Sequence, residues 1–182
     1  MAVSLLRHTT PLVAPGTCYG MTDLGLAESF AEEAENILSG LPPVEQIVTS
    51  PLTRCQQLAD FMSKRLSVPV TTDCRLREMD FGTWEGRAWA DIPRAEINAW
   101  VSDFMHARPH GGESVAMLRA RTLEAIAELE NRQQETLIVT HAGVIKAALA
   151  AAETAASHSA AIGFGCYVTL IPNRQGASHE HR

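Results

Sequence analysis

The chain begins with a short apolar run that ends abruptly on two polar residues. Val3, Leu5 and Leu6 precede Arg7 and His8, and so short a run predicts a buried β-strand rather than a helix. At the carboxyl end of a strand in an open α/β sheet, polar side chains lie at the crevice where such sheets bind ligands. This run therefore constrains both the fold and the position of a site.

The same design recurs later in the chain. Residues 136–140 (TLIVT) form a second apolar run that leads directly into His141. Arg54 follows a short run at 45–49 and falls in the first turn of a predicted helix, beside free backbone N–H groups that favour an anion. We expect these strand ends to meet in one crevice, together with His8.

Short apolar runs alternate with helix-compatible segments along most of the chain. Further strands are predicted at 45–49, 68–72, 136–140 and 164–171, and helices at 24–38, 51–66, 88–107, 115–133 and 144–156. Ser50 and Ser114 are the predicted N-caps of the second and fourth helices. This alternation predicts an α/β fold, a three-layer α/β/α sandwich with a mostly parallel central sheet. One domain is expected over residues 1–172, with a flexible tail at 173–182.

Composition narrows the range of functions. The chain has 182 residues, of which 46% are hydrophobic and 20% charged, as in an ordinary soluble domain. Its formal net charge of −6 gives no basic footprint for nucleic acid or an anionic membrane. Without a membrane-length apolar run or a signal-peptide core, a cytoplasmic protein is expected. The scattered cysteines form no CxxC pair, which argues against a zinc site.

Two arginines and two histidines in one crevice suit the chemistry of a phosphoryl group. Planar guanidinium groups match phosphate oxygens, so Arg7 and Arg54 are candidate phosphate ligands. Neutral imidazole is nucleophilic near neutral pH, so a histidine in this set can attack phosphorus. Metal ligation by His8 and His141 is the rival interpretation. It lacks a clear third ligand, and the flanking arginines would repel a cation, so no metal is expected.

Cleavage of a phosphate ester also needs a proton for the leaving oxygen. Glu78, Asp80 and Glu85 lie in a glycine-broken, partly apolar stretch, where a carboxylic acid can act as general acid. Their spacing does not choose among them, and an ordinary solvated acidic loop is the alternative interpretation.

Five segments, in this order along the chain, resemble the histidine phosphatase superfamily, branch 1, the phosphoglycerate-mutase-like group. They are residues 7–9, 50–54, 76–86, 111–114 and 140–143. The similarity extends to about residue 171 and implies the fold of that group. It implies that His8 is the nucleophile that becomes phosphohistidine and that Glu78 protonates the leaving oxygen, then activates water. It further implies no organic cofactor, a small phosphorylated substrate, and phosphate binding by Arg7, Arg54, His141 and Thr22.

One departure from the usual family pattern points to a substrate. The family commonly has glycine after the Arg-His pair, and Thr9 stands here instead. Residues 7–23 (RHTTPLVAPGTCYGMTD) are similar to the α-ribazole-5′-phosphate phosphatases of cobalamin synthesis. Hydrolysis of that ester is therefore the favoured function. A sugar or nucleotide phosphatase, a phosphoglycerate mutase and a catalytically silent phosphate-binding module remain alternatives.

Three tryptophans are open to two interpretations. Trp84, Trp89 and Trp100 can offer a stacking face for a benzimidazole-type base, or they can belong to the hydrophobic core. The sequence assigns no role to His106, His110 and His158, and it does not indicate an oligomeric state.

Overall fold

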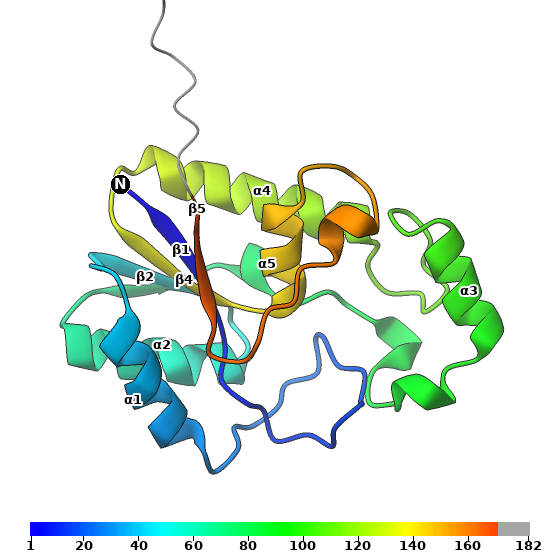
Figure 1. Cartoon of the computed structure of the whole chain (residues 1–182), viewed down its shortest axis with the longest axis horizontal. Coiled ribbons are helices and arrows are strands. Elements are labelled where there is room, and N and C mark those ends of the chain that lie inside the picture. Colours follow the sequence, from blue (N-terminus) through cyan, green and yellow to red (C-terminus); the bar gives the residue numbers. More distant parts are fainter. Residues whose placement is uncertain (171–182) are drawn as a thin grey trace, which may run out of the picture.

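A five-stranded sheet forms the centre of the molecule, with its strands in the order β3-β2-β4-β1-β5 (Figure 1). The strands are β1 (Val3–Arg7), β2 (Gln46–Thr49), β3 (Val70–Thr72), β4 (Thr136–Thr140) and β5 (Tyr167–Leu170). The first four pair in parallel, and β5 pairs antiparallel with β1. The computed structural model describes residues 1–170, and the predicted tail at 173–182 lies outside the described residues.

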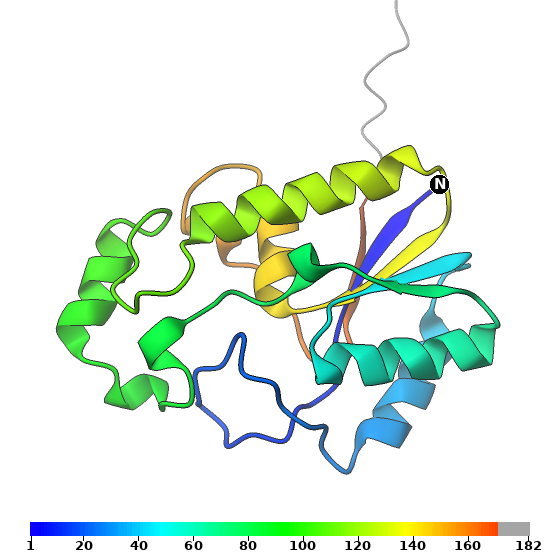
Figure 2. The same cartoon turned by 180° about the vertical axis from the view of Figure 1, so that it is seen from behind.

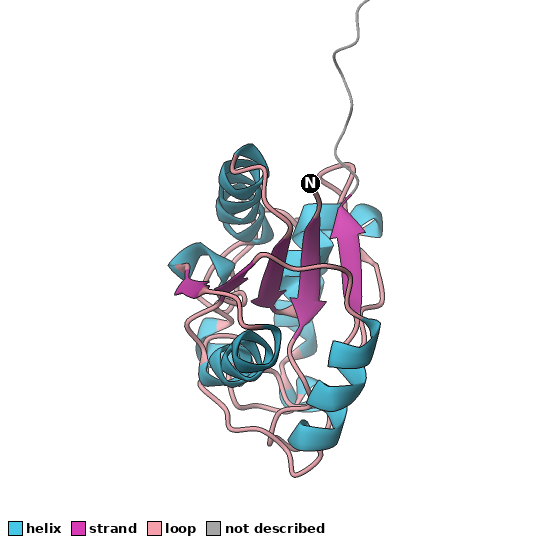
Figure 3. Ribbon diagram, turned by 90° about the vertical axis from the view of Figure 1, so that its left-hand side faces the viewer, coloured by secondary structure: helices cyan, strands magenta, loops and turns pink. Residues whose placement is uncertain are grey.

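Helices cover both faces of this sheet. They are α1 (Phe30–Gly40), α2 (Thr53–Leu66), α3 (Arg94–Ser102), α4 (Val115–Asn131) and α5 (Ala142–Leu149). α1 and α2 pack on one face and α4 and α5 on the other (Figure 3), which confirms the predicted α/β/α sandwich. α3 lies at one end of the molecule, away from the sheet (Figure 2). Among residues 1–170, no helix combines the length and apolar character needed to span a membrane.

Side chains of the central strands alternate between the two helical layers because successive residues of a strand point to opposite faces. In β1, Leu5 joins the core beneath α4 and α5, and Leu6 joins the core beneath α1 and α2. In β4, Ile138 joins the first core, and Leu137 and Val139 join the second. Both faces of these strands are buried, and for this reason the sequence shows continuous apolar runs there.

The register of the sheet places the ends of three strands at one level. Arg7 at the end of β1 lies opposite Thr140 at the end of β4, and Thr49 of β2 lies opposite Val139. The backbone N–H of His8 donates to the Thr140 carbonyl at 3.0 Å. The residues that follow β1, β2 and β4 therefore leave the sheet side by side.

Two helices are shorter than predicted at their amino-terminal side. The helix expected at 24–38 begins at Phe30, because Leu26 forms an isolated antiparallel bridge with Pro11. The segment expected to be helical at 88–107 contains α3 and one short 3₁₀ turn, Trp89–Asp91. In both cases the chain before the helix is held by contacts with other loops.

Of the predicted ends of the other helices, some agree with the structure and some do not. Ser114 caps α4 as predicted, since its hydroxyl accepts the Met117 N–H at 3.2 Å. α2 begins at Thr53, without a side-chain cap from Ser50. The helix expected at 144–156 ends at Leu149, and residues 151–156 are exposed. Alanine-rich sequence alone does not sustain a helix that packs against nothing.

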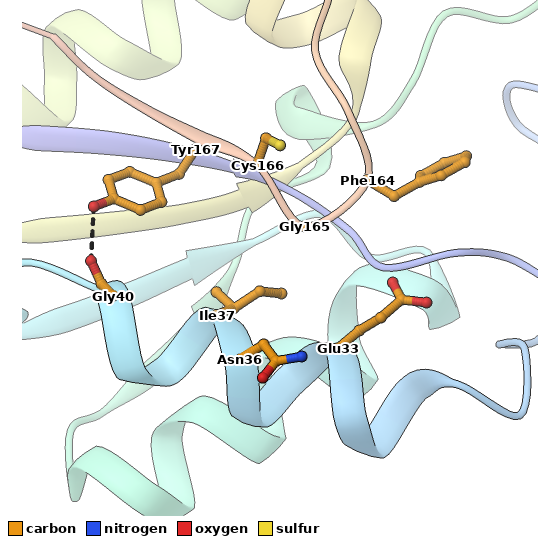
Figure 4. A pocket seen from close by; sticks show the side chains of 8 residues that line it. All are labelled: Glu33, Asn36, Ile37, Gly40, Phe164, Gly165, Cys166 and Tyr167. Atoms are coloured by element: carbon orange, nitrogen blue, oxygen red, sulfur yellow. Dashed lines mark hydrogen bonds between the residues drawn. The ribbon is translucent and has the colours of Figure 1, made fainter.

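A groove lies between α1 and residues 164–167, the segment that leads into β5 (Figure 4). The Tyr167 hydroxyl donates to the Gly40 carbonyl at 2.7 Å, which ties β5 to the end of α1. Gly165 fits closely against Ile37, because a Cβ there would lie 3.1 Å from the Ile37 Cδ1 atom. These contacts fix the segment that leads from Phe164 into β5.

Candidate active site

The two predicted histidines and Arg54 meet at the carboxyl ends of three parallel strands. His8 follows β1 directly, His141 follows β4, and Arg54 lies in the first turn of α2, just after β2. The imidazole centroids of His8 and His141 are 5.2 Å apart. All three side chains are buried. The structure thus brings these residues together as the strand pattern predicted.

His8 is a buried, neutral imidazole at the edge of a cavity. Its Nδ1 lies 2.7 Å from the carbonyl oxygen of Thr9, which can only accept, so Nδ1 carries the hydrogen. Burial lowers the pKa of His8 from 6.5 to about 3; the Thr9 bond opposes this shift, and the charges of Arg54 and Arg7 add to it. At neutral pH the free lone pair is therefore on Nε2, the atom available for nucleophilic attack.

His141 is fully buried and is held from the turn between β2 and α2. Its Nε2 lies 2.8 Å from the Ser50 hydroxyl and 3.5 Å from the Cys55 sulfur. Burial, together with the charge of Arg54, lowers the pKa of His141 well below 6.5, so this ring is also neutral. The N-cap predicted at Ser50 is wrong because α2 begins at Thr53 and Leu52 is its N-cap residue. The Ser50 hydroxyl accepts the Leu52 N–H at 3.3 Å and also contacts His141.

Arg54 is fully buried and is held by the backbone of residues 20–22. Its Nη1 donates to the Thr22 carbonyl at 2.8 Å, and its Nη2 donates to the Gly20 carbonyl at 2.7 Å. Its buried Nε–H has no hydrogen-bond partner within residues 1–170. A buried guanidinium donor that lacks a partner favours an anion beside it.

Glu85 fixes the loop that holds Arg54. Its carboxylate accepts backbone hydrogen bonds of 2.9 to 3.1 Å from Gly20, Met21, Thr22 and Phe81. Burial raises the pKa of Glu85, but these bonds and that of the Thr22 hydroxyl outweigh it and hold the pKa below its ordinary value.

Thr22, predicted to bind phosphate, lies between Glu85 and Arg54. Its hydroxyl and its backbone N–H both donate to Glu85, and its side chain does not line the cavity beside His8. Only its carbonyl oxygen reaches the site, where it accepts from Arg54. Thr22 therefore holds the Arg54 guanidinium, and its direct contact with phosphate stays a prediction.

Arg7 lies between an aromatic ring and a backbone carbonyl. Its guanidinium carbon is 3.8 Å from the centroid of the Phe164 ring, a cation–π arrangement, and its Nη1 donates to the Ile162 carbonyl at 2.5 Å. In the described part of the chain its buried Nε–H has no partner. Arg7 and Arg54 thus each have a buried Nε–H without a partner in residues 1–170, and the charges of both help to lower the pKa of His8.

Glu78 lines the cavity with His8, whereas Asp80 and Glu85 do not. One oxygen of Glu78 accepts the backbone N–H of the next residue at 2.9 Å, and the other accepts the Gly143 N–H at 3.0 Å. Asp80 accepts a backbone N–H within its own turn. Of the three acidic side chains that the sequence left open, Glu78 is the one that lines the cavity with His8.

The cavity beside His8 has a volume of about 490 Å³ and two chemically different ends. At one end lie Arg7, His8, Glu78 and Gly143. The apolar end is defined by Phe81, Trp89, Trp100 and Phe104, whose neighbouring ring centroids lie 5.6 to 6.4 Å apart. Val115, Leu118 and Ile162 also line the cavity. Such a volume is typical of a site for a whole small molecule.

The three tryptophans divide between the core and this cavity. Trp84 is 0% exposed and donates its Nε1–H to Glu96 at 2.6 Å. Trp89 and Trp100 line the cavity, with their ring planes 20° apart and their centroids separated by 6.4 Å. The core interpretation therefore holds for Trp84, and the other two form an aromatic wall.

Three further cavity residues were missed by the sequence analysis: Tyr19, Lys146 and His158. Lys146 follows Gly143 by three positions in α5, and this helical spacing could have indicated that the two share a face. His158 lies in a short 3₁₀ turn after an alanine-rich segment, where no sequence signal marks it. Within residues 1–170, no group of three His, Cys, Asp or Glu side chains is arranged to hold a metal ion.

Comparison with known proteins identifies relatives over most of the chain. An adenosylcobalamin/alpha-ribazole phosphatase of Escherichia coli K12 is 31% identical over 158 residues, covering 82% of this chain and 78% of that protein. A glucosyl-3-phosphoglycerate phosphatase of Mycolicibacterium vanbaalenii is 33% identical over 163 residues, covering 81% of this chain and 72% of that protein.

Solved structures and a family profile agree with these relatives. The alpha-ribazole phosphatase of Shigella flexneri superposes with a TM-score of 0.83 at 29% identity, covering 96% of this chain and 92% of that one. A mycobacterial glucosyl-3-phosphoglycerate phosphatase superposes with a TM-score of 0.80 at 27% identity, covering 92% of this chain and 88% of that one. The profile of the histidine phosphatase superfamily (branch 1) matches residues 3–171. The chain therefore belongs to branch 1 of the histidine phosphatase superfamily.

Proposed function

We propose that this protein hydrolyses a phosphate monoester through a phosphohistidine on His8. The observation that carries the proposal is a neutral His8, with its lone pair on Nε2, that lies close enough to Arg54 and Arg7 for their charges to lower its pKa. Each of these arginines has a buried Nε–H that lacks a partner in residues 1–170. A nucleophile beside unpaired cationic donors suits a phosphoryl group, whose oxygens those donors would bind.

In the first step, Nε2 of His8 attacks phosphorus and the bond from phosphorus to the ester oxygen breaks. Arg7, Arg54 and His141 stabilise the equatorial oxygens, as arginine donors do for a transferring phosphoryl group. Glu78 enters this step protonated and donates its proton to the leaving oxygen. The alcohol then departs towards the apolar end of the cavity.

In the second step, water releases the phosphoryl group from His8. The Glu78 carboxylate left by the first step accepts a proton from the attacking water, and the bond between Nε2 and phosphorus breaks. Inorganic phosphate and neutral His8 result, and Glu78 is again protonated. Neither step requires a metal ion or an organic cofactor.

We propose α-ribazole 5′-phosphate as the substrate, with α-ribazole and phosphate as products. The relatives from Escherichia coli and Shigella flexneri carry that substrate in their names, and residues 7–23 share the pattern of that subfamily. The aromatic wall of Trp89 and Trp100 offers a face on which a benzimidazole ring can stack. A glucosyl-3-phosphoglycerate phosphatase is the second candidate, because relatives of that name have similar identity.

A substrate panel tests both parts of the proposal. The panel contains α-ribazole 5′-phosphate, glucosyl-3-phosphoglycerate, 3-phosphoglycerate, sugar phosphates and p-nitrophenyl phosphate. We expect the highest kcat/KM with α-ribazole 5′-phosphate; a preference for glucosyl-3-phosphoglycerate would select the second candidate. His8→Ala should abolish both turnover and ³²P labelling of the protein, and turnover at the parental rate would exclude His8 as the nucleophile.

A further inference from the structure

The lining of the cavity includes three polar groups that the proposed chemistry does not use. Trp100 Nε1 and His158 Nε2 are buried and have no hydrogen-bond partner within residues 1–170. Lys146 forms no salt bridge with the described residues. All three residues line the cavity. Buried polar groups are nearly always paired in folded proteins, so unpaired ones at a cavity wall point to a ligand or a bound water.

The hydrogen-bonding character of His158 follows from its fixed neighbour. Its Nδ1 lies 2.8 Å from the Thr154 carbonyl oxygen, which can only accept, so in the neutral ring Nδ1 carries the hydrogen and Nε2 is an acceptor. The side chain is 7% exposed and packs against Phe104, with 5.5 Å between ring centroids. His158 therefore offers a lone pair from a rigid position.

The other two groups are donors. Trp100 has a single N–H and packs on the other side of Phe104, at 5.7 Å between centroids. Lys146 lies three residues after Gly143 in α5 and lines the same cavity. The cavity thus combines flat aromatic faces with two donors and one acceptor.

We propose that Lys146, Trp100 and His158 form a leaving-group subsite that selects an N-glycoside of a heteroaromatic base, a nucleoside-like alcohol. The inference rests on the proposed phosphatase function and assigns the residues that choose its substrate. A ring nitrogen of the base accepts from Trp100 or Lys146, and a sugar hydroxyl donates to His158. A bare sugar carries many hydroxyls, and this wall has too few polar groups to satisfy them.

Substitutions of the three residues, compared with control substitutions of the same kind, test the subsite. His158→Phe and Trp100→Phe remove the acceptor and the donor while keeping an aromatic ring, and Lys146→Met removes the charge while keeping the stem. His106→Phe and Lys64→Met are the controls, because neither residue lines this cavity. Each variant is assayed with α-ribazole 5′-phosphate, with glucosyl-3-phosphoglycerate and with p-nitrophenyl phosphate, which has neither a sugar nor a ring nitrogen.

We expect each subsite variant to lose about tenfold more kcat/KM with α-ribazole 5′-phosphate than with p-nitrophenyl phosphate, the size of one hydrogen bond. The controls should show no such difference. Equal losses with both substrates, or no loss, would overturn the subsite. A selective loss with glucosyl-3-phosphoglycerate instead would overturn the nucleoside-like class and assign Lys146 to a carboxylate.

Binding of the free alcohol separates this inference from the proposed reaction. α-Ribazole lacks the phosphate, so its calorimetric affinity for the His8→Ala protein reports on the subsite without catalysis. Weaker binding after a further His158→Phe change would support the subsite even if His8 proved not to be the nucleophile. Affinity that is unchanged in all three subsite variants would refute it, whatever the outcome of the activity assays.

Discussion

Gly143→Ala should separate the catalytic activity of this protein from its stability. Gly143 is the second residue of α5, and its N–H holds one oxygen of Glu78 at 3.0 Å. An alanine Cβ at this position would lie 2.1 Å from Glu78 Oε1, whereas ordinary contacts begin at 3.4 Å. The carboxyl group would therefore have to retreat by about 1.3 Å, because packed atoms do not overlap.

The expected cost follows from that displacement. A misplacement of about 1 Å costs on the order of 10²-fold in rate, and general acid catalysis contributes about 10² to 10⁴-fold. We expect kcat/KM for alkyl phosphates to fall about 10²-fold, which corresponds to about 2.7 kcal/mol of transition-state stabilisation. Alanine is favoured over glycine in a helix, which partly offsets the lost hydrogen bond, so the free energy of unfolding should change by only about 1 kcal/mol.

The assay compares leaving groups of different basicity. p-Nitrophenol departs without a proton, so its ester should lose less than about tenfold when Glu78 is displaced. Gly40→Ala is the matched control, because a Cβ there meets nothing within 4 Å. Parental activity of Gly143→Ala with alkyl phosphates would refute the assignment of Glu78 as the acid held by Gly143, and so would an equal loss with both classes of ester.

Three further predictions follow from the same contacts. Arg54→Ala should weaken inhibition by inorganic phosphate about 10- to 100-fold. Glu85→Gln should weaken this inhibition less. Adding Glu85→Gln to Arg54→Ala should have almost no further effect, because Glu85 acts through the loop that holds Arg54. Independent effects of the two changes would contradict that linkage. Between pH 6.5 and about 3 the unfolded chain binds a proton at His8 that the folded protein does not, so stability falls as the pH is lowered through this window. The urea concentration at the midpoint of denaturation should therefore be lower at pH 5 than at pH 7, and the decrease should be smaller in His8→Asn. An equal decrease in both proteins would argue that His8 is not buried as a neutral ring. Exhaustive dialysis against EDTA should leave turnover unchanged, and activity restored by an added metal ion would revive a metal mechanism.

The central strands and the position of the site could be predicted because burial on both faces leaves a strong sequence signal. The run at 136–140 coincides with β4, and the polar residues after β1 and β4 meet as expected. Family resemblance pointed to Glu78, which spacing alone could not separate from Asp80 and Glu85. The cavity then distinguished them, because it depends on contacts between distant loops.

Other features were beyond the sequence because tertiary contacts override local preference. Ser50 is a residue type that favours an N-cap, yet α2 begins at Thr53, and the Ser50 hydroxyl also contacts His141, which lies 91 positions later. Thr22 fits a phosphate-binding pattern, yet Glu85 takes its hydroxyl. The alanine-rich residues after Leu149 favour a helix by propensity, but they have no surface to pack on.

The common level at which β1 and β4 end has a consequence for how this protein can diverge. Inserting one residue within β1 would turn His8 to the opposite face of the sheet, so the strands tolerate almost no change in length. The walls of the cavity come from separate loops and short helices after those strands, where insertions are tolerated. In the proposed reaction, selection can therefore change which leaving alcohol the cavity recognises while the side chains proposed to contact the phosphoryl group stay in place. Relatives with the same fold are accordingly named for different phosphate esters.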